Sequence, residues 1–93
     1  MSGALSGIKV LDLTRVLAGP WTGQLLADLG AEVIKVERPG SGDDTRQWAP
    51  PSLPDGTAAY YLAANRGKQS LTVDITQPAG QAIVRQLAAE ADV

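Results

Sequence analysis

The order of apolar and polar residues in the first third of the chain predicts a strand, a helix and a second strand. Residues 8–13 (IKVLDL) form a short apolar run bounded by a glycine and a turn, which is typical of a buried strand. Apolar residues then recur at helical spacing after Pro20, which suits the first position of a helix, and Gly30 suits its end. These apolar positions are Trp21, Leu25, Leu26 and Leu29. Residues 32–37 (EVIKVE) alternate and predict a second strand, which completes a βαβ unit with a right-handed crossover.

The rest of the chain predicts a long loop, a third strand and a second helix. Residues 39–56 hold several prolines and glycines without periodicity, and such a long irregular loop is usually functional or mobile. Residues 58–65 are apolar and predict a short helix or a turn, and residues 70–74 predict the third strand. A helix beginning at Pro78 carries the apolar positions Ile83, Val84, Leu87 and Ala88. The last residues, AEADV, match a helix end leading into another strand, so the pattern as a whole predicts an α/β fold.

Composition narrows the classes of function. The 93 residues suffice for one small domain, and the net charge of −2 argues against binding to nucleic acid or to an anionic membrane. Because the sequence contains no Cys and no His, it offers no disulfide, no thiolate or imidazole metal ligand and no Ser-His-Asp triad. No run of about 18 apolar residues predicts a membrane span, and the first residues lack the features of a signal peptide. We therefore expect a cytoplasmic protein without a membrane segment.

The turn after the first predicted strand is the first candidate site. It contains Arg15 and leads through Gly19 into a helix, and both a cation and a helix N-terminus favour an anionic ligand at the carboxyl end of a strand. Only one glycine of a GxGxxG pattern is present, so a dinucleotide fingerprint is weak. A plain turn with a solvated arginine explains the same residues equally well.

Arg38, directly after the second predicted strand, is the second candidate. In dinucleotide-binding folds an acidic residue at this place binds ribose hydroxyls, whereas an arginine suits a ribose phosphate because its fork binds two phosphate oxygens. Alternatively, Arg38 pairs with Glu37, Asp43 or Asp44 in a surface cluster that contributes little energy.

Two further groups of charged residues could form binding sites, but an ordinary structural role explains each of them better. Arg66 and Lys68 could hold a pyrophosphate, but solvated loop charges are the better interpretation from composition alone. The acidic pair Asp43 and Asp44 has no further ligands nearby in the sequence, so it predicts no metal site.

Two stretches together resemble the N-terminal part of the class III CoA-transferase family. They read GIKVLDLTRVLAGPWTGQLLADLGAEVIKVERPGSGDDTRQWAPP and YYLAANRGKQSLTVDI, in the order and spacing of the family. The family includes formyl-CoA and carnitine-CoA transferases and alpha-methylacyl-CoA racemase. The resemblance implies that residues 1–93 form the N-terminal piece of the large domain, with a Rossmann-like parallel sheet that binds coenzyme A.

The resemblance also implies which residues contact coenzyme A. They lie in the turn after the first strand, at the arginine after the second strand and at the end of the third strand. In this sequence they are Val16, Leu17, Ala18, Arg38, Val73, Asp74, Ile75 and Thr76. Leu17 stands where some members have a polar residue. The small residues of the turn would let the backbone approach the adenosine diphosphate.

Within the family, the resemblance favours transfer of CoA from an acyl-CoA to a small carboxylic acid. Racemases shorten the loop after the second strand, whereas this chain keeps GSGDDTRQWAPP at residues 40–51. A family racemase and a short non-catalytic CoA-binding domain are the alternatives. The aspartate nucleophile of the family, which forms covalent intermediates, lies beyond the position that matches Val93, so no residue here is expected to be catalytic. The family also implies an interlocked homodimer for the complete enzyme, and no metal.

Overall fold

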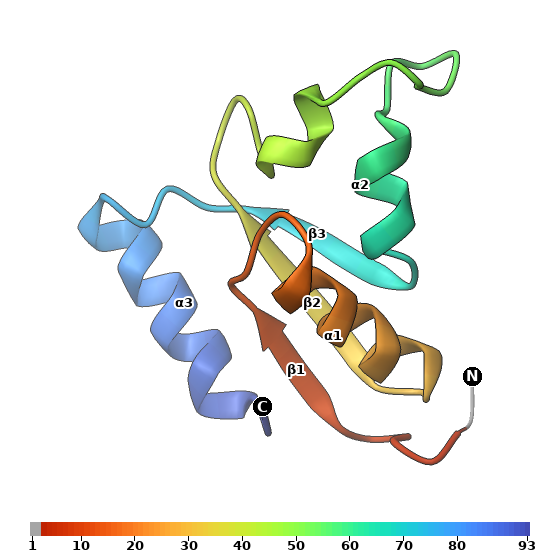
Figure 1. Ribbon diagram of the computed structural model, residues 1–93. Coiled ribbons are helices and arrows are strands. Elements are labelled where there is room, and N and C mark those ends of the chain that lie inside the picture. Colours follow the sequence, from red (N-terminus) through yellow and green to blue (C-terminus); the bar gives the residue numbers. More distant parts are fainter. Residues whose placement is uncertain (1–2) are drawn as a thin grey trace.

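Three parallel strands form the centre of the computed structural model, which describes residues 3–93 (Figure 1). The strands are β1 (Lys9–Asp12), β2 (Glu32–Glu37) and β3 (Lys68–Thr72), paired in the order β1-β2-β3. The helices are α1 (Ala18–Asp28), α2 (Ala59–Ala64) and α3 (Pro78–Glu90), and one 3-10 turn, η1, spans Asp44–Gln47. The predicted α/β fold is confirmed, including the short helix within residues 58–65.

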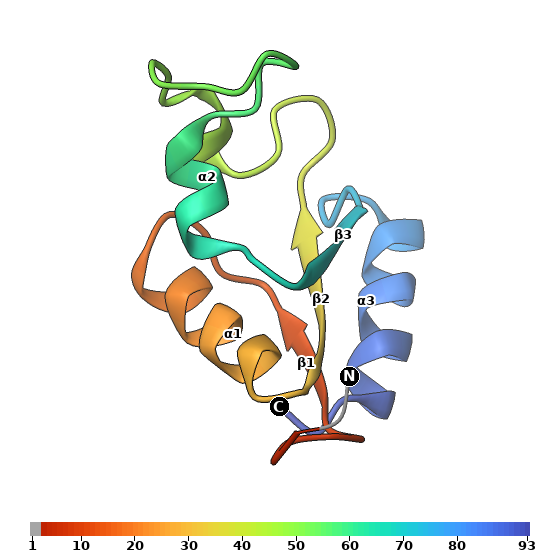
Figure 2. The same ribbon diagram turned by 90° about the vertical axis from the view of Figure 1, so that its right-hand side faces the viewer.

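The helices cover both faces of the sheet. Helices α1 and α2 lie on one face and α3 lies on the other (Figure 2). After α3, Val93 lies beside the free edge of β1: the Leu11 amide donates to the Val93 carbonyl at 2.9 Å, and the Val93 amide donates to the Lys9 carbonyl at 3.3 Å. This is the bonding of a parallel pair, although residues 91–93 do not form the predicted strand and the sheet has three strands. Because β2 and β3 follow on one side of β1 and the tail after α3 returns to its other side, the order along the sheet reverses at β1, which makes it a topological switch point.

The apolar core lies between α1 and the sheet. Val10, Ala31 and Val33 are buried there, and Leu26 is among the partly buried side chains that pack against them. Gly30 ends the helix region with a φ of +106°, in the left-handed conformation that glycine adopts readily.

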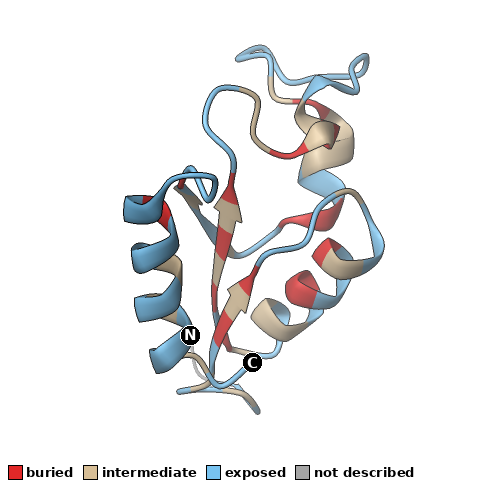
Figure 3. Cartoon of the chain, turned by 90° about the vertical axis from the view of Figure 1, so that its left-hand side faces the viewer, coloured by how far each residue is buried: buried red, intermediate tan, exposed pale blue. Residues whose placement is uncertain are grey.

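The predicted buried face of α1 is largely wrong. Trp21 is 63% exposed, and Leu25 and Leu29 are exposed as well, whereas the buried positions are Pro20, Gly23 and Gln24. Figure 3 shows that α1 as a whole is only partly buried. The reason is what this part of α1 packs against. A Cβ atom at Gly23 would lie 2.9 Å from a carboxylate oxygen of Asp12, so only a small residue fits against the charged groups below it.

Two other elements differ from their predicted form. The third strand begins at Lys68 rather than at residue 70, directly after Gly67, whose φ is +78°. Helix α3 begins at Pro78 as predicted, but its apolar positions bury little: Ile83 is 46% exposed and Gly80 is its only buried residue. Residues 39–56 are irregular except for η1, and Ser52 forms an isolated bridge with Ala58.

Candidate functional site

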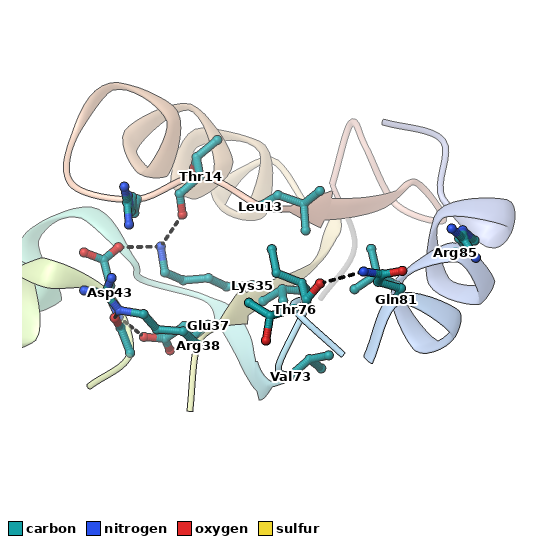
Figure 4. Close-up of a pocket in the computed structure, with 15 residues that line it drawn as sticks. Leu13, Thr14, Lys35, Glu37, Arg38, Asp43, Val73, Thr76, Gln81 and Arg85 are labelled. Atoms are coloured by element: carbon teal, nitrogen blue, oxygen red, sulfur yellow. Dashed lines mark hydrogen bonds and ion pairs between the residues drawn. The ribbon is translucent and has the colours of Figure 1, made fainter. Parts of the chain in front are cut away.

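A cleft of about 720 Å³ opens at the carboxyl ends of the strands, between the sheet and α3 (Figure 4). Ligands of doubly wound α/β folds bind at this edge, next to the switch point. Apolar side chains form much of the wall, among them Leu13, Val36 and Val84. Three arginines also line the cleft: Arg15, Arg38 and Arg85.

The structure places half of the predicted coenzyme A contacts in this cleft. Those that line it are Arg38, Val73, Ile75 and Thr76. Val16, Leu17 and Ala18 do not line it, but they follow Thr14 and Arg15, which do, and Ala18 is the first residue of α1. The Asp74 carboxylate accepts hydrogen bonds from the amide and hydroxyl of Thr76, so it shapes the turn after β3 rather than the wall of the cleft.

Arg38 lies at the rim of the cleft with its side chain 49% exposed. Its guanidinium pairs with Asp44, and its Nε donates to Ser41 Oγ at 2.8 Å and to the Gly42 carbonyl at 3.0 Å. The Arg15 guanidinium lies 4.0 Å from the same Asp44 carboxylate. The surface-cluster alternative therefore describes the contacts of Arg38 correctly, with Asp44 as the acidic partner. These contacts also hold the guanidinium beside the cleft.

The two cations of the segment at 65–68 have structural partners. Arg66 pairs with Asp28 at the surface at 2.7 Å, as expected for a solvated charge. Lys68 is different, because its ammonium group is buried and donates to Asp12 at 2.8 Å, to the Pro20 carbonyl at 2.7 Å and to Asn65 at 2.9 Å. The expectation of a solvated Lys68 is therefore wrong. Its ammonium joins the carboxyl end of β1 and the first turn of α1 to the start of β3.

A second buried lysine supports the turn after β1. The Lys35 and Asp43 side chains are both 0% exposed and form an ion pair of 2.8 Å. The same Lys35 ammonium donates to the Thr14 carbonyl at 3.1 Å. Desolvation acts to raise the pKa of Asp43, but the hydrogen bonds from Lys35 and Thr45 outweigh it, so the pKa is lowered.

Glu37, at the end of β2, accepts more hydrogen bonds than its position in the sequence suggests. Arg46 donates to both of its carboxylate oxygens at 2.7 and 2.8 Å, and the Asp43 amide donates at 2.8 Å. The hydroxyls of Ser70 and Tyr61 also donate to it. Burial acts to raise the pKa of Glu37, but these hydrogen bonds lower it from 4.5 to about 2. Burial and the Glu37 charge together raise the pKa of Tyr61 to about 12.

The lowered pKa of Glu37 predicts that the folded protein loses stability in acid. Because the folded pKa is about 2 and the unfolded one 4.5, ionised Glu37 stabilises the fold above pH 4.5, and this contribution disappears as the pH falls toward 2. The amount at neutral pH is up to about 3 kcal/mol. Thermal unfolding of the complete protein from pH 7 to pH 2 measures it. The Glu37→Gln variant should be less stable at pH 7 and show a shallower decline, and an equally steep decline would contradict this role for Glu37.

Sequence reasoning missed these buried charges, although one signal was present. The alternation of residues 32–37 places Lys35 and Glu37 on the same face as Val33, which is 1% exposed. A central strand in a covered sheet buries every side chain on the same face as its core residue, charged ones included. No group of His, Cys, Asp or Glu within residues 3–93 could hold a metal ion. Over the same residues, no helix is long and apolar enough to cross a membrane.

Comparison with known proteins decides the family. The model of CoA-transferase family III matches residues 5–93. The chain belongs to CoA-transferase family III. The succinate–glutarate CoA-transferase of Agrobacterium fabrum is 60% identical over 94 residues, which cover 96% of this chain and 24% of the relative. The succinyl-CoA:glutarate CoA-transferase of Homo sapiens is 60% identical over 90 residues, which cover 96% of this chain and 20% of the relative.

A solved structure agrees with the fold of this family III chain. A CAIB/BAIF family protein from Brucella suis matches with a TM-score of 0.93 and 55% identity, over 99% of this chain and 25% of the other. The family resemblance and the Rossmann-like fold are thereby confirmed. The chain spans between a fifth and a quarter of the length of these relatives. The similarity therefore extends over only that part of each relative.

Proposed function

We propose that these residues form the coenzyme A-binding segment of an enzyme that transfers CoA from an acyl-CoA to a carboxylic acid. The observation that carries this proposal is the cleft at the switch point, where apolar walls meet several arginines in a chain that belongs to CoA-transferase family III. In the proposed reaction the donor's thioester becomes a free carboxylate, and the acceptor's carboxylate becomes a new thioester. The nucleophile for this exchange would come from a part of the complete enzyme outside these residues.

The cleft fits the chemistry of coenzyme A. Its volume of about 720 Å³ lies within the range of roughly 300–1,000 Å³ that is usual for ligand pockets. Leu13, Val36 and Ile75 offer apolar surface to the adenine or the pantetheine arm. Arg15 and Arg38 offer guanidinium groups, which bind phosphate oxygens in pairs. In this proposal the chain binds and orients the nucleotide end of CoA and carries out no bond-breaking step.

The relatives favour a short dicarboxylic acid as the acceptor. Two of them, at 60% identity, are named as CoA-transferases of succinate or succinyl-CoA and glutarate. Relatives named as formyl-CoA:oxalate CoA-transferases are less similar, at 43% identity. We therefore propose succinyl-CoA as the donor and a dicarboxylic acid such as glutarate as the acceptor. An assay of the complete enzyme with succinyl-CoA and either glutarate or oxalate tests this order, and a preference for oxalate would contradict it.

Substitutions of Arg38 test whether coenzyme A binds in this cleft. We expect the Arg38→Ala variant of the complete enzyme to bind CoA about tenfold more weakly, because a charge-assisted phosphate contact is worth roughly 1.5 kcal/mol. The Arg38→Lys variant should recover part of the affinity, since lysine keeps the charge but not the fork. Calorimetric titration with CoA measures both. Arg66→Ala is the matched control, because Arg66 is also exposed but pairs with Asp28 outside the cleft. Equal CoA affinity in the parent and in Arg38→Ala would remove Arg38 from the site.

A further inference from the structure

The turn between β1 and α1 contains a residue in an unfavourable conformation. Val16 has a φ of +77°, whereas every other described residue with a positive φ is a glycine. A β-branched side chain is rarely found in this left-handed region, because its branched carbon crowds the backbone. Such a conformation persists only where the surrounding structure holds it, and it is found most often at functional sites.

Asp43 and Lys35 hold this turn from its two sides. The Val16 amide donates to both carboxylate oxygens of Asp43, at 3.3 Å each. The Lys35 ammonium, paired with Asp43 at 2.8 Å, donates to the Thr14 carbonyl at 3.1 Å. One buried ion pair therefore binds an amide and a carbonyl that flank Arg15. Figure 4 shows the Lys35 side chain reaching between Asp43 and Thr14.

Asp43 is itself fixed on the other side. Its carboxylate accepts hydrogen bonds from the Thr45 amide and hydroxyl, both at 2.9 Å, and its own amide donates to Glu37 at 2.8 Å. Counted as whole residues, backbone included, Asp43 is 3% exposed and Thr45 is 0% exposed. The ion pair thus connects the turn after β1 to the end of β2 and to η1, through groups with little freedom to move.

Asp12 fixes the start of the turn by accepting a hydrogen bond from the Thr14 amide at 2.9 Å, but this bond does not reach Val16. Leu17 is the N-cap residue of α1 and supplies no capping hydrogen bond from its side chain. Thr14 and Arg15, which line the cleft, come directly before Val16 in the chain. Because a change in φ at Val16 alters the direction of the chain on both sides, it would move Arg15 relative to Arg38 across the cleft.

We infer that Asp43, together with Lys35, is a positioning residue for coenzyme A: it keeps Val16 left-handed and so places the turn at 14–18 against the cleft. This inference rests on the proposed function, because it concerns the same site. Asp43 lies in the wall of the cleft, but its carboxylate oxygens are already bonded to Lys35, Val16 and Thr45, so none is left to bind the ligand directly. Its effect reaches the ligand through the backbone of the turn.

The inference predicts a selective kinetic defect in the complete enzyme. The Asp43→Asn variant should raise the dissociation constant for CoA and the KM for the acyl-CoA donor about tenfold, the low end of what a strained residue costs when its support is lost. The KM for the carboxylic acid acceptor should change less than twofold. A purely structural role would instead lower stability and the amount of active enzyme while leaving both KM values near those of the parent.

Glycine at position 16 provides the decisive rescue. Glycine adopts positive φ without the crowding that valine suffers, so it needs no carboxylate to hold it there. In the Val16→Gly background, Asp43→Asn should therefore weaken CoA binding less than twofold, whatever the Val16 side chain itself contributes. If Asp43→Asn costs the same tenfold with glycine as with valine at position 16, the inference is overturned.

Further measurements keep the inference testable if Asp43→Asn does not fold, and they separate its failure from a failure of the proposed function. Thr45→Val keeps the ion pair but removes one hydrogen bond to Asp43, so it should weaken CoA binding about threefold. If Asp43→Asn does not fold, this variant tests the inference instead, and an unchanged CoA affinity would contradict it. Hydrogen exchange at residues 14–18 should be faster in Thr45→Val than in the parent, whether or not CoA binds. A parent enzyme that binds no CoA at millimolar concentration overturns the proposed function, whereas a parent that binds CoA beside an equally tight Asp43→Asn overturns only this inference.

Discussion

Replacing Lys35 by methionine is expected to destabilise the fold by about 3–5 kcal/mol, the usual cost of removing one partner from a buried ion pair. Lys35 and Asp43 are both 0% exposed, so the remaining carboxylate would be buried without its cation. The carbonyl of Thr14 would also lose the ammonium that donates to it. Methionine has a similar length and fills the space of the lysine stem, so the loss reports the charge rather than a cavity. Thermal or chemical unfolding of the complete protein measures the effect.

Lys9→Met is the matched control for this change. Lys9 also lies on a strand of the sheet, but its side chain is exposed and its position pairs with Glu32 at the other end of β2. Surface substitutions of this kind usually change stability by no more than about 0.5 kcal/mol. Similar losses in Lys35→Met and Lys9→Met would show that the buried pair contributes nothing beyond an ordinary surface charge.

Replacing Gly80 by alanine is expected to lower stability although alanine is the better helix former. A Cβ atom at this position would lie 1.9 Å from the Asp74 carbonyl oxygen and 3.1 Å from a methyl carbon of Val73. The nearer contact is with backbone, so α3 or the turn after β3 must move. Overpacking of this kind costs about 1–3 kcal/mol, which outweighs the roughly 1 kcal/mol that helix propensity gains.

Gly80→Ala should also weaken CoA binding, because the turn that must move carries Ile75 and Thr76 in the wall of the cleft. Ala82→Gly is the control in the same helix, since Ala82 is exposed and should lose about 1 kcal/mol by propensity alone without affecting CoA. Increased stability in Gly80→Ala would show that α3 does not pack closely on the turn after β3.

Local sequence signals predicted the elements better than their contacts. The strands and helices follow from periodicity, and Pro78 begins α3 and Gly30 follows α1 as their chemistry predicts. The buried face of α1 could not be predicted in this way. Gly23 lies against Asp12 and Lys68, which are far apart in the sequence and meet only when β1 and β3 are placed in the sheet.

The residues of the site also differ in whether the sequence predicted them. Arg38 and Thr76 were predicted through the family resemblance, and both line the cleft. The ion pair of Lys35 and Asp43 was not predicted, because in the sequence an acidic residue within a loop of glycines and charges looks solvated. Its burial depends on the loop after β2 folding back over the turn after β1, and no local pattern encodes that contact.

Coenzyme A should bind at the carboxyl edge of this sheet, and a crystal structure of the complete enzyme with CoA is the decisive experiment. CoA phosphates are expected within hydrogen-bond distance of the Arg38 guanidinium, with the nucleotide or pantetheine arm against the residues at 73–76 and Val16 still at positive φ. CoA bound elsewhere, with Arg38 still paired only to Asp44 and the cleft empty, would contradict it.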